Sequence, residues 1–88
     1  MTVWKFHIPQ VTPFVAWLPQ GARIVAVQVQ DAAPYFWAEV DPNAEGENRV
    51  FHIVGTGRNL PSVAERRCYL GTWQAPPYVF HLYEEVSP

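Results

Sequence analysis

Short runs of apolar and aromatic residues, each bounded by Pro, Gly, Asn or Asp, recur along the whole chain. Seven runs have the length of a β-strand, and they cover residues 3–8, 12–18, 23–29, 35–40, 50–54, 67–74 and 78–83. Several alternate, as Trp4, Phe6 and Ile8 do against Lys5 and His7. Such alternation is typical of strands that bury one face, and the spacing favours antiparallel neighbours joined by short turns.

Nine prolines punctuate this pattern. Because proline has no backbone donor, it interrupts a central strand or the interior of a helix, so most of these residues are expected in turns. Pro13 lies inside the second run and predicts an edge strand, an early bend or an irregular extended segment there. Between the fourth and fifth runs, residues 41–49 (DPNAEGENR) carry acidic and turn-forming side chains and predict a long hairpin tip.

Only one segment has the chemistry of a helix start. Asn59 is a suitable N-cap, Pro61 follows near the first turn, and Glu65 lies late in the same segment. We therefore expect a single helical turn over residues 59–66 and no helix longer than about two turns. The predicted fold class is all-β, with one domain over residues 1–88 that forms a small antiparallel sandwich or partly open barrel of about six strands. An α+β arrangement is the alternative.

Composition adds a prediction about assembly. Hydrophobic residues make up 49% of the 88 residues, which is enough to build one core, whereas charged residues make up only 16%. Soluble domains usually carry about 25% charged residues, so we expect apolar surface to remain exposed on a single copy. This exposed surface favours a homo-oligomer.

Charge and cysteine content exclude several classes of protein. Six Lys and Arg stand against eight Asp and Glu, and the basic residues cluster only at Arg66 and Arg67, so a general nucleic-acid binder with a basic face is not expected. The single cysteine, Cys68, excludes an intramolecular disulfide and fits a reducing cytosol. No signal peptide is visible, and no apolar stretch approaches the roughly eighteen residues of a membrane span. We expect no association with a membrane.

The histidines and the cysteine do not form a catalytic or metal-ligating pattern. His7, His52 and His81 lie in separate predicted strands without HxH or HxxxH spacing, which favours solvent-facing or hydrogen-bonded strand histidines over a zinc site. A Cys68, histidine and acid arrangement is formally available, but nothing near the thiol in sequence activates it, so a structural cysteine is favoured. We therefore expect no catalytic residue, no metal and no cofactor, and we do not expect an enzyme.

The segment after the fifth run is the strongest candidate for ligand contact. Gly55, Thr56 and Gly57 leave a predicted strand in the geometry in which backbone N–H groups can bind an anion, and Arg58 and Asn59 add a fixed positive charge and an amide. The rest of a dinucleotide fingerprint or P-loop is missing. The alternative is that Gly55 and Gly57 serve only to allow positive φ at the strand exit.

Aromatic residues supply the second candidate surface. Most of those in the strands are expected to pack in the core, namely Trp4, Phe6, Trp37, Phe51 and Phe80. Four other aromatic residues lie near turns or on the opposite face of a strand from the expected core residues, namely Trp17, Tyr35, Trp73 and Tyr78. Exposed aromatic rings stack on bases or anchor partners. We assign Trp73 and Tyr35 to the candidate ligand site together with the Gly55, Thr56, Gly57, Arg58 and Asn59 loop.

Two motifs resemble those of a family of small uncharacterised proteins from bacteriophage and prophage genomes, a domain of unknown function with WA-x-VD and F-x-I-x-GTG segments. The matching residues are Trp37, Ala38, Val40 and Asp41 for the first motif and Phe51, Ile53, Gly55, Thr56 and Gly57 for the second. The resemblance covers nearly the whole chain. It implies a phage-encoded accessory protein that acts in the host bacterial cytoplasm and binds a host protein or a signalling nucleotide.

We therefore expect a non-catalytic phage protein that antagonises host defence by sequestering a small anionic, nucleotide-derived ligand. One alternative is an inhibitor that binds a host protein through an edge strand or an aromatic patch. A virion-assembly or structural role is a second alternative.

Overall fold

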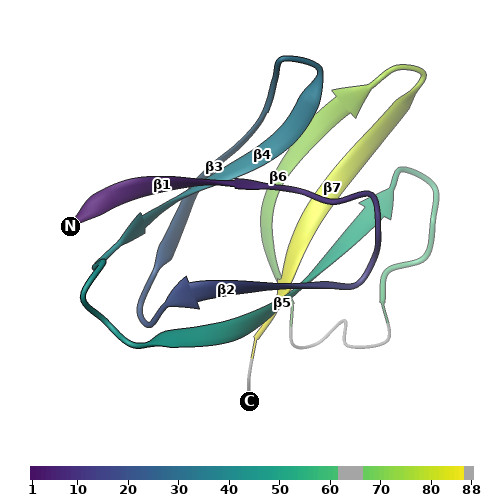
Figure 1. Ribbon diagram of the computed structural model, residues 1–88. Coiled ribbons are helices and arrows are strands. Elements are labelled where there is room, and N and C mark those ends of the chain that lie inside the picture. Colours follow the sequence, from purple (N-terminus) through teal and green to yellow (C-terminus); the bar gives the residue numbers. More distant parts are fainter. Residues whose placement is uncertain (62–66, 87–88) are drawn as a thin grey trace.

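The computed structural model describes residues 1–61 and 67–86, and these residues form an all-β fold (Figure 1). Its strands are β1 (Thr2–His7), β2 (Phe14–Pro19), β3 (Arg23–Gln30), β4 (Ala33–Val40), β5 (Gly46–Gly55), β6 (Arg67–Ala75) and β7 (Tyr78–Glu85). Each of the seven apolar runs forms a strand, including the run that contains Pro13. Residues 62–66, which carry most of the expected helical turn, lie outside the described residues.

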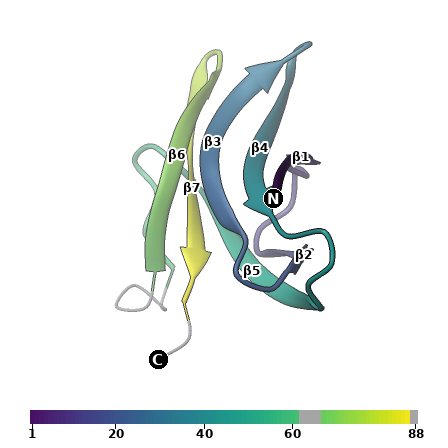
Figure 2. The ribbon, with the colours of Figure 1, turned by 90° about the vertical axis from the view of Figure 1, so that its left-hand side faces the viewer.

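The strands form two antiparallel sheets that face each other as a sandwich (Figure 2). Sheet A has the order β1-β4-β3, and sheet B has the order β2-β5-β7-β6. The sheets are not closed into a barrel, so of the two architectures expected from the pattern the sandwich is confirmed. Within residues 1–61 and 67–86, no helix has the length and apolarity needed to cross a membrane.

The segment after β4 is not the hairpin tip that its composition predicts. β4 belongs to sheet A and β5 to sheet B, so residues 41–45 cross between the two layers, and β5 begins at Gly46 rather than at Val50. Asp41 shapes this crossing, because its carboxylate accepts a hydrogen bond from the Asn43 backbone N–H at 3.0 Å. The hairpin prediction is wrong because turn-forming residues mark a change of direction without specifying which strands pair afterwards.

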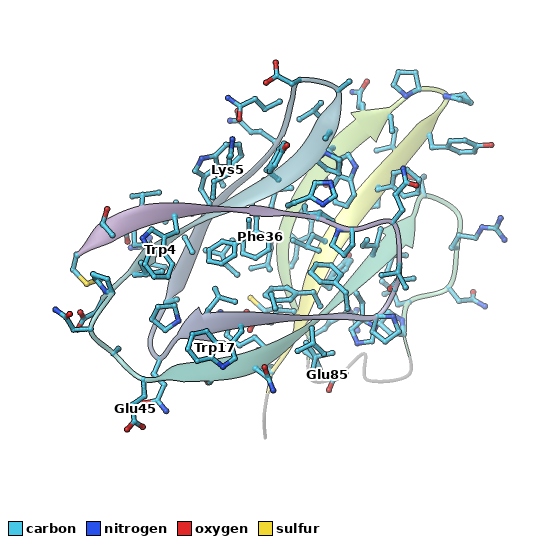
Figure 3. All side chains as sticks on the ribbon, viewed as in Figure 1. Trp4, Lys5, Trp17, Phe36, Glu45 and Glu85 are labelled. Carbon is cyan, nitrogen blue, oxygen red and sulfur yellow. The ribbon has the colours of Figure 1, made fainter. Side chains whose placement is uncertain are left out.

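Inward-facing side chains of the two sheets build one core. Phe36 lies near the centre of the molecule (Figure 3). Its ring lies 4.9 Å from Phe6 and 5.3 Å from Phe51, and Phe51 lies 5.2 Å from Phe14, measured between ring centroids. The buried hydrophobic residues around this row are Ile8, Leu18, Ala22, Ala38, Val40, Trp73 and Leu82. The four phenylalanine rings therefore join the two layers through the centre of the sandwich.

The free edges of β3 and β6 lie side by side, and a glycine lets them approach (Figure 2). A Cβ at Gly71 would stand 2.7 Å from the Val27 Cβ, which is closer than real side chains come. Both strands are irregular here, with register shifts between Ile24 and Ala26 in β3 and between Tyr69 and Gly71 in β6. On the other side of the sandwich, β1 and β2 are the edges of their sheets.

A partly buried ion pair lies between the layers. Arg49 Nη2 donates to Glu84 Oε1 at 2.7 Å, and Arg49 Nη1 donates to the Ala22 carbonyl oxygen at 2.6 Å. The hydrogen bond with Glu84 raises the pKa of the Arg49 guanidinium above its ordinary value, against the opposing effect of burial. This pair connects β5 and β7 to the turn that precedes β3.

Candidate ligand-binding site

The loop after β5 begins with a tight turn. The Arg58 backbone N–H donates to the Gly55 carbonyl oxygen at 3.0 Å, and Gly57 occupies the left-handed region with a φ of 89°. Of the two glycines expected to need positive φ, only Gly57 does. The Thr56 N–H donates to the Val79 carbonyl oxygen at 3.0 Å, so two of the loop amides expected to face an anion already bond within the protein.

Arg58 is the positive group that this turn offers to a ligand. Arg58 Cγ lies 3.6 Å from the position that a Cβ at Gly55 would take. The first part of the Arg58 side chain therefore packs against the backbone of the turn. In the part of the chain that the structure describes, no side chain forms a hydrogen bond or an ion pair with the Arg58 guanidinium. Its five N–H donors are thus available to a phosphate or a carboxylate.

A depression of about 420 Å³ lies between this turn and the β6–β7 hairpin. It is lined by Gly55, Thr56, Arg58, Pro77, Tyr78 and Val79. Tyr78 is 64% exposed, so its ring is available to a ligand. The depression therefore combines one accessible aromatic ring with a cation that has no side-chain partner among residues 1–61 and 67–86.

Three aromatic rings connect this depression to the interior. Trp73 in β6 pairs with Phe80 in β7, and their ring centroids are 5.7 Å apart. The Tyr78 ring follows at 6.0 Å from Phe80. Tyr78, Phe80 and the buried Leu82 are two residues apart along β7, so they point to the same face of sheet B, which is turned toward sheet A. Trp73 pairs with Phe80 and points the same way.

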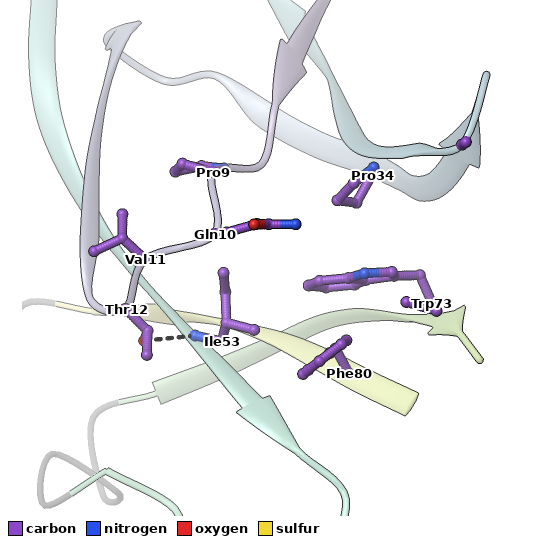
Figure 4. Close-up of a pocket in the computed structure, with 10 residues that line it drawn as sticks. Pro9, Gln10, Val11, Thr12, Pro34, Ile53, Trp73 and Phe80 are labelled. Atoms are coloured by element: carbon purple, nitrogen blue, oxygen red, sulfur yellow. Dashed lines mark hydrogen bonds between the residues drawn. The ribbon is translucent and has the colours of Figure 1, made fainter. Parts of the chain in front are cut away.

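Trp73 also lines a second, more apolar cavity of about 240 Å³ (Figure 4). The cavity lies between residues 9–12, which follow β1, and the inner face of sheet B, with Ile53, Phe80 and Ala75 on the same side as Trp73. Trp73 is only 6% exposed, so the prediction of a surface tryptophan is wrong. Its inward strand phase, shared with Phe80, is the physical reason.

The turn is held on the opposite face of sheet B by His81. Thr56 Oγ1 lies 2.8 Å from His81 Nε2 and 3.2 Å from the Val79 carbonyl oxygen, while Thr72 Oγ1 lies 2.9 Å from His81 Nδ1. Through these contacts Thr56 and Thr72 hold the His81 ring between them, and Thr56 anchors the turn to β7.

The structure brings together only some of the residues assigned to the site from the sequence. Gly55, Thr56 and Arg58 share one depression with Tyr78, whereas Asn59 lines a different depression with Thr12 and His52. Gly57 is exposed at the turn, outside the lining of the Arg58 depression.

Tyr35 is far from this group in the fold because it belongs to the outer face of sheet A. Its ring lies 6.1 Å from Trp37, between centroids, and Lys5 Nζ lies 4.7 Å from the Tyr35 centroid. Trp37 was expected in the core, but it shares this outer phase, and Phe36 and Ala38 are buried instead. Tyr35 and Trp73 therefore cannot contact one small ligand.

Sequence reasoning missed Phe80 and Gln10 as lining residues. The alternation of β7 contained a signal for Phe80, since Tyr78, Phe80 and Leu82 share one phase. Nothing local signals Gln10, because its position depends on how the connection after β1 folds over sheet B.

The histidines and the cysteine occupy separate places. His7 lies in sheet A, His52 Nε2 lies 3.0 Å from Glu85 Oε1, and His81 bonds to two threonines. Cys68 is exposed, and its Sγ lies 3.8 Å from the Tyr69 carbonyl oxygen. No group of three or more metal-ligating side chains occurs among the described residues.

Comparison with known proteins places the chain in a family without assigning an activity. No curated protein matches it, and no solved structure matches it. A family model described as a domain of unknown function, DUF7352, matches residues 1–88. The chain therefore belongs to the DUF7352 family.

Proposed function

We propose that this protein is a non-catalytic binding protein for a small anionic, nucleotide-derived ligand, held in the depression beside Arg58. The observation that supports this most directly is the guanidinium of Arg58, which has no partner among the described side chains and lies in the same depression as the exposed ring of Tyr78. A guanidinium binds phosphate through two parallel hydrogen bonds, and an aromatic ring stacks on a base.

The energetics of these two contacts suit a ligand of this class. A hydrogen bond to a charged group contributes about 1.5 to 3 kcal/mol, and stacking of one base contributes about 1 to 3 kcal/mol. The local charge matters more than usual, because the whole chain has a net charge of -2 and few basic residues. Anion binding would therefore depend strongly on Arg58.

We further propose that the protein is encoded by a phage and acts in the host bacterial cytoplasm, where it sequesters a defence signal. The resemblance of its motifs to phage and prophage proteins is the basis for this step. Sequestration requires no turnover. Arg58 suits such a role, because a guanidinium only donates hydrogen bonds and would hold a phosphate without attacking it.

Isothermal titration calorimetry with AMP and with inorganic phosphate tests the proposal. We expect AMP to bind the wild-type protein and Arg58→Ala to weaken binding about ten- to a hundredfold, as the loss of one charge-assisted contact predicts. Arg23→Ala is the matched control, because the Arg23 side chain is 80% exposed on sheet A. Equal AMP binding by wild type and Arg58→Ala would move the site away from this depression.

Recovery of the bound nucleotide tests the non-catalytic part. We expect AMP to be released chemically unchanged after prolonged incubation. Accumulation of product beyond one equivalent per chain would show turnover and contradict a sequestering role.

A second candidate function, inhibition of a host protein by strand addition, rests on β2. This edge strand is uncharged from Val11 to Gly21, although edge strands usually carry charges that prevent such pairing. Val15 and Trp17 are 60% and 63% exposed, and the Trp17 ring occupies the space beside Gly46 that a Cβ there would need. An extended segment of a partner could add to this edge.

Phage plating on bacteria with a nucleotide-signalling defence separates the two candidates. If the protein sequesters a nucleotide, Arg58→Ala loses protection of the phage and Trp17→Lys retains it. If it inhibits a host protein through β2, the two variants behave in the opposite way.

A further inference from the structure

The second cavity is lined by residues of both sheets and of the connection after β1 (Figure 4). Trp73 and Phe80 form one wall, Pro34 of β4 stands opposite, and the segment from Pro9 to Thr12 covers the remaining side. Thr12 holds this segment in place, because its Oγ1 accepts a hydrogen bond from the Ile53 backbone N–H at 2.9 Å. The cavity is therefore bounded by residues from both sheets and by an anchored connection.

The size and lining of the cavity restrict what it can hold. An apolar protein cavity of about 150 Å³ accommodates a benzene molecule, so about 240 Å³ has room for one ring system of up to two fused rings. The described residues that line it carry no charge. A charged group would lose its hydration without gaining a partner there, and a neutral ring would not.

Gln10 supplies the polar group that distinguishes a heterocycle from a plain hydrocarbon. Its side chain extends into the cavity toward Trp73 (Figure 4). Within the described part of the chain, the Gln10 amide forms no hydrogen bond. An amide offers a donor and an acceptor side by side, which matches the edge of a purine, as the pairing of Gln with the adenine N6 and N7 atoms illustrates.

We propose that this cavity is a binding site for a neutral planar heterocycle of purine size, stacked on Trp73 and hydrogen-bonded by Gln10. The cavity shares no lining residue with the depression at Arg58, where the exposed Tyr78 ring would stack on a base, although the rings of Trp73, Phe80 and Tyr78 form one row between them. The inference therefore goes beyond the proposed function and does not rest on it.

Adenosine is the probe for this cavity, because it has the ring without the charge. Ala75 is exposed and lines the cavity, so Ala75→Phe fills it from the side. Gln74→Phe is the matched control, since the neighbouring residue of β6 points to the opposite face of sheet B. Adenosine binding is followed by NMR through the Trp73 indole N–H signal, assigned with Trp73→Phe.

We expect adenosine to shift the Trp73 signal in the wild type and in Gln74→Phe, and its affinity to fall at least tenfold in Ala75→Phe. Gln10→Leu should weaken adenosine binding about three- to tenfold, as the loss of one neutral hydrogen bond predicts, and should leave binding of cyclohexylmethanol unchanged.

Three results would overturn the proposed cavity site. These are unchanged adenosine binding by Ala75→Phe, cyclohexylmethanol binding as tight as that of adenosine, and absence of any adenosine effect on Trp73 at millimolar concentration. Inorganic phosphate provides the separate test of Arg58, because phosphate has no ring. Phosphate binding is lost only if the proposed anion site is wrong. Failure of the anion site and failure of the cavity site can therefore be told apart.

Discussion

Thr56 Oγ1 lies 2.8 Å from His81 Nε2, and this contact ties the turn that carries Arg58 to the middle of β7. The same hydroxyl donates to the Val79 carbonyl oxygen, so one side chain joins the turn to the strand at two points. The candidate anion site is thus built on a loop whose base is anchored to a sheet.

Replacing Thr56 tests this anchor. Thr56→Val removes both hydroxyl contacts, and we expect the free energy of unfolding to fall by about 1 kcal/mol, the usual net contribution of a hydrogen bond. AMP binding should weaken severalfold because Arg58 is positioned less firmly. Thr56→Ser keeps the hydroxyl and should behave as the wild type in urea denaturation and calorimetry. Equal stability of Thr56→Val and Thr56→Ser would show that the hydroxyl does not anchor the turn.

The two glycines of the turn should respond differently to alanine. Gly57 has a φ of 89°, and an alanine there costs about 1 to 2 kcal/mol in the left-handed region. A Cβ at Gly55 would lie 3.6 Å from Arg58 Cγ and 3.7 Å from a Phe80 ring carbon, which are ordinary contacts. We expect Gly55→Ala to change stability by less than about 0.5 kcal/mol in chemical denaturation. Similar losses in both variants would contradict the turn geometry.

The Arg49 and Glu84 pair should be required for stability. Arg49→Met leaves the Glu84 carboxylate buried without its partner, and breaking a buried pair in this way costs about 3 to 5 kcal/mol. Arg23→Met is the control, because Arg23 is 80% exposed in its ion pair with Glu39 and should change stability by less than about 1 kcal/mol.

The raised pKa of Arg49 sets the pH range in which its charge stabilises the fold. Because the hydrogen bond with Glu84 raises that pKa, the stabilisation from the Arg49 charge is fully present below the ordinary arginine pKa and is lost only as the pH rises through the raised value. The stability deficit of Arg49→Met relative to the wild type should therefore be the same at pH 7 and at pH 9 in urea denaturation. A deficit that shrinks between these two pH values would contradict a guanidinium that stays charged in the folded protein.

The contact between Gly71 and Val27 should appear as energetic coupling. Gly71→Ala forces its Cβ against Val27 and is expected to cost about 1 to 3 kcal/mol, as overpacking does elsewhere. Val27→Ala creates space on β3, so the double variant should be more stable than the sum of the single changes predicts. Strict additivity in a double-mutant cycle would mean that β3 and β6 do not meet at these residues.

Self-association remains a prediction from composition, and the exposed edge of β2 is where we expect it. Light scattering at micromolar concentration should give a mass above the 10.1 kDa of one chain. Val15→Lys should lower that mass by placing a charge on the uncharged edge. Val29→Lys, at an exposed position of β3, should not. A wild-type mass near 10.1 kDa would refute the prediction.

Local sequence was sufficient to predict where strands form in this protein. Short apolar runs bounded by turn-forming residues identified all seven strand segments, and several of them also alternate, because run length and side-chain period are properties of the strand itself. Pro13, which comes just before β2, left open an edge strand, an early bend and an irregular extended segment, and the edge strand is what the structure has. Gly57 and Arg58 also predicted a turn that carries a positive charge, because the conformational freedom of glycine and the charge of arginine are properties of the residues themselves.

Tertiary structure alone decided which strands pair and which phase of each strand is buried. Residues 41–45 cross between the sheets because burial of Phe36 against Phe51 depends on groups distant in the sequence. Aromatic residues lie on both faces of β4, so its sequence does not show which face is buried. Only the packing of the two sheets places Tyr35 on the outer face of sheet A. The cavity of Trp73 and Gln10 exists only once the connection after β1 covers sheet B. Such long-range burial leaves no signal in a short stretch of chain.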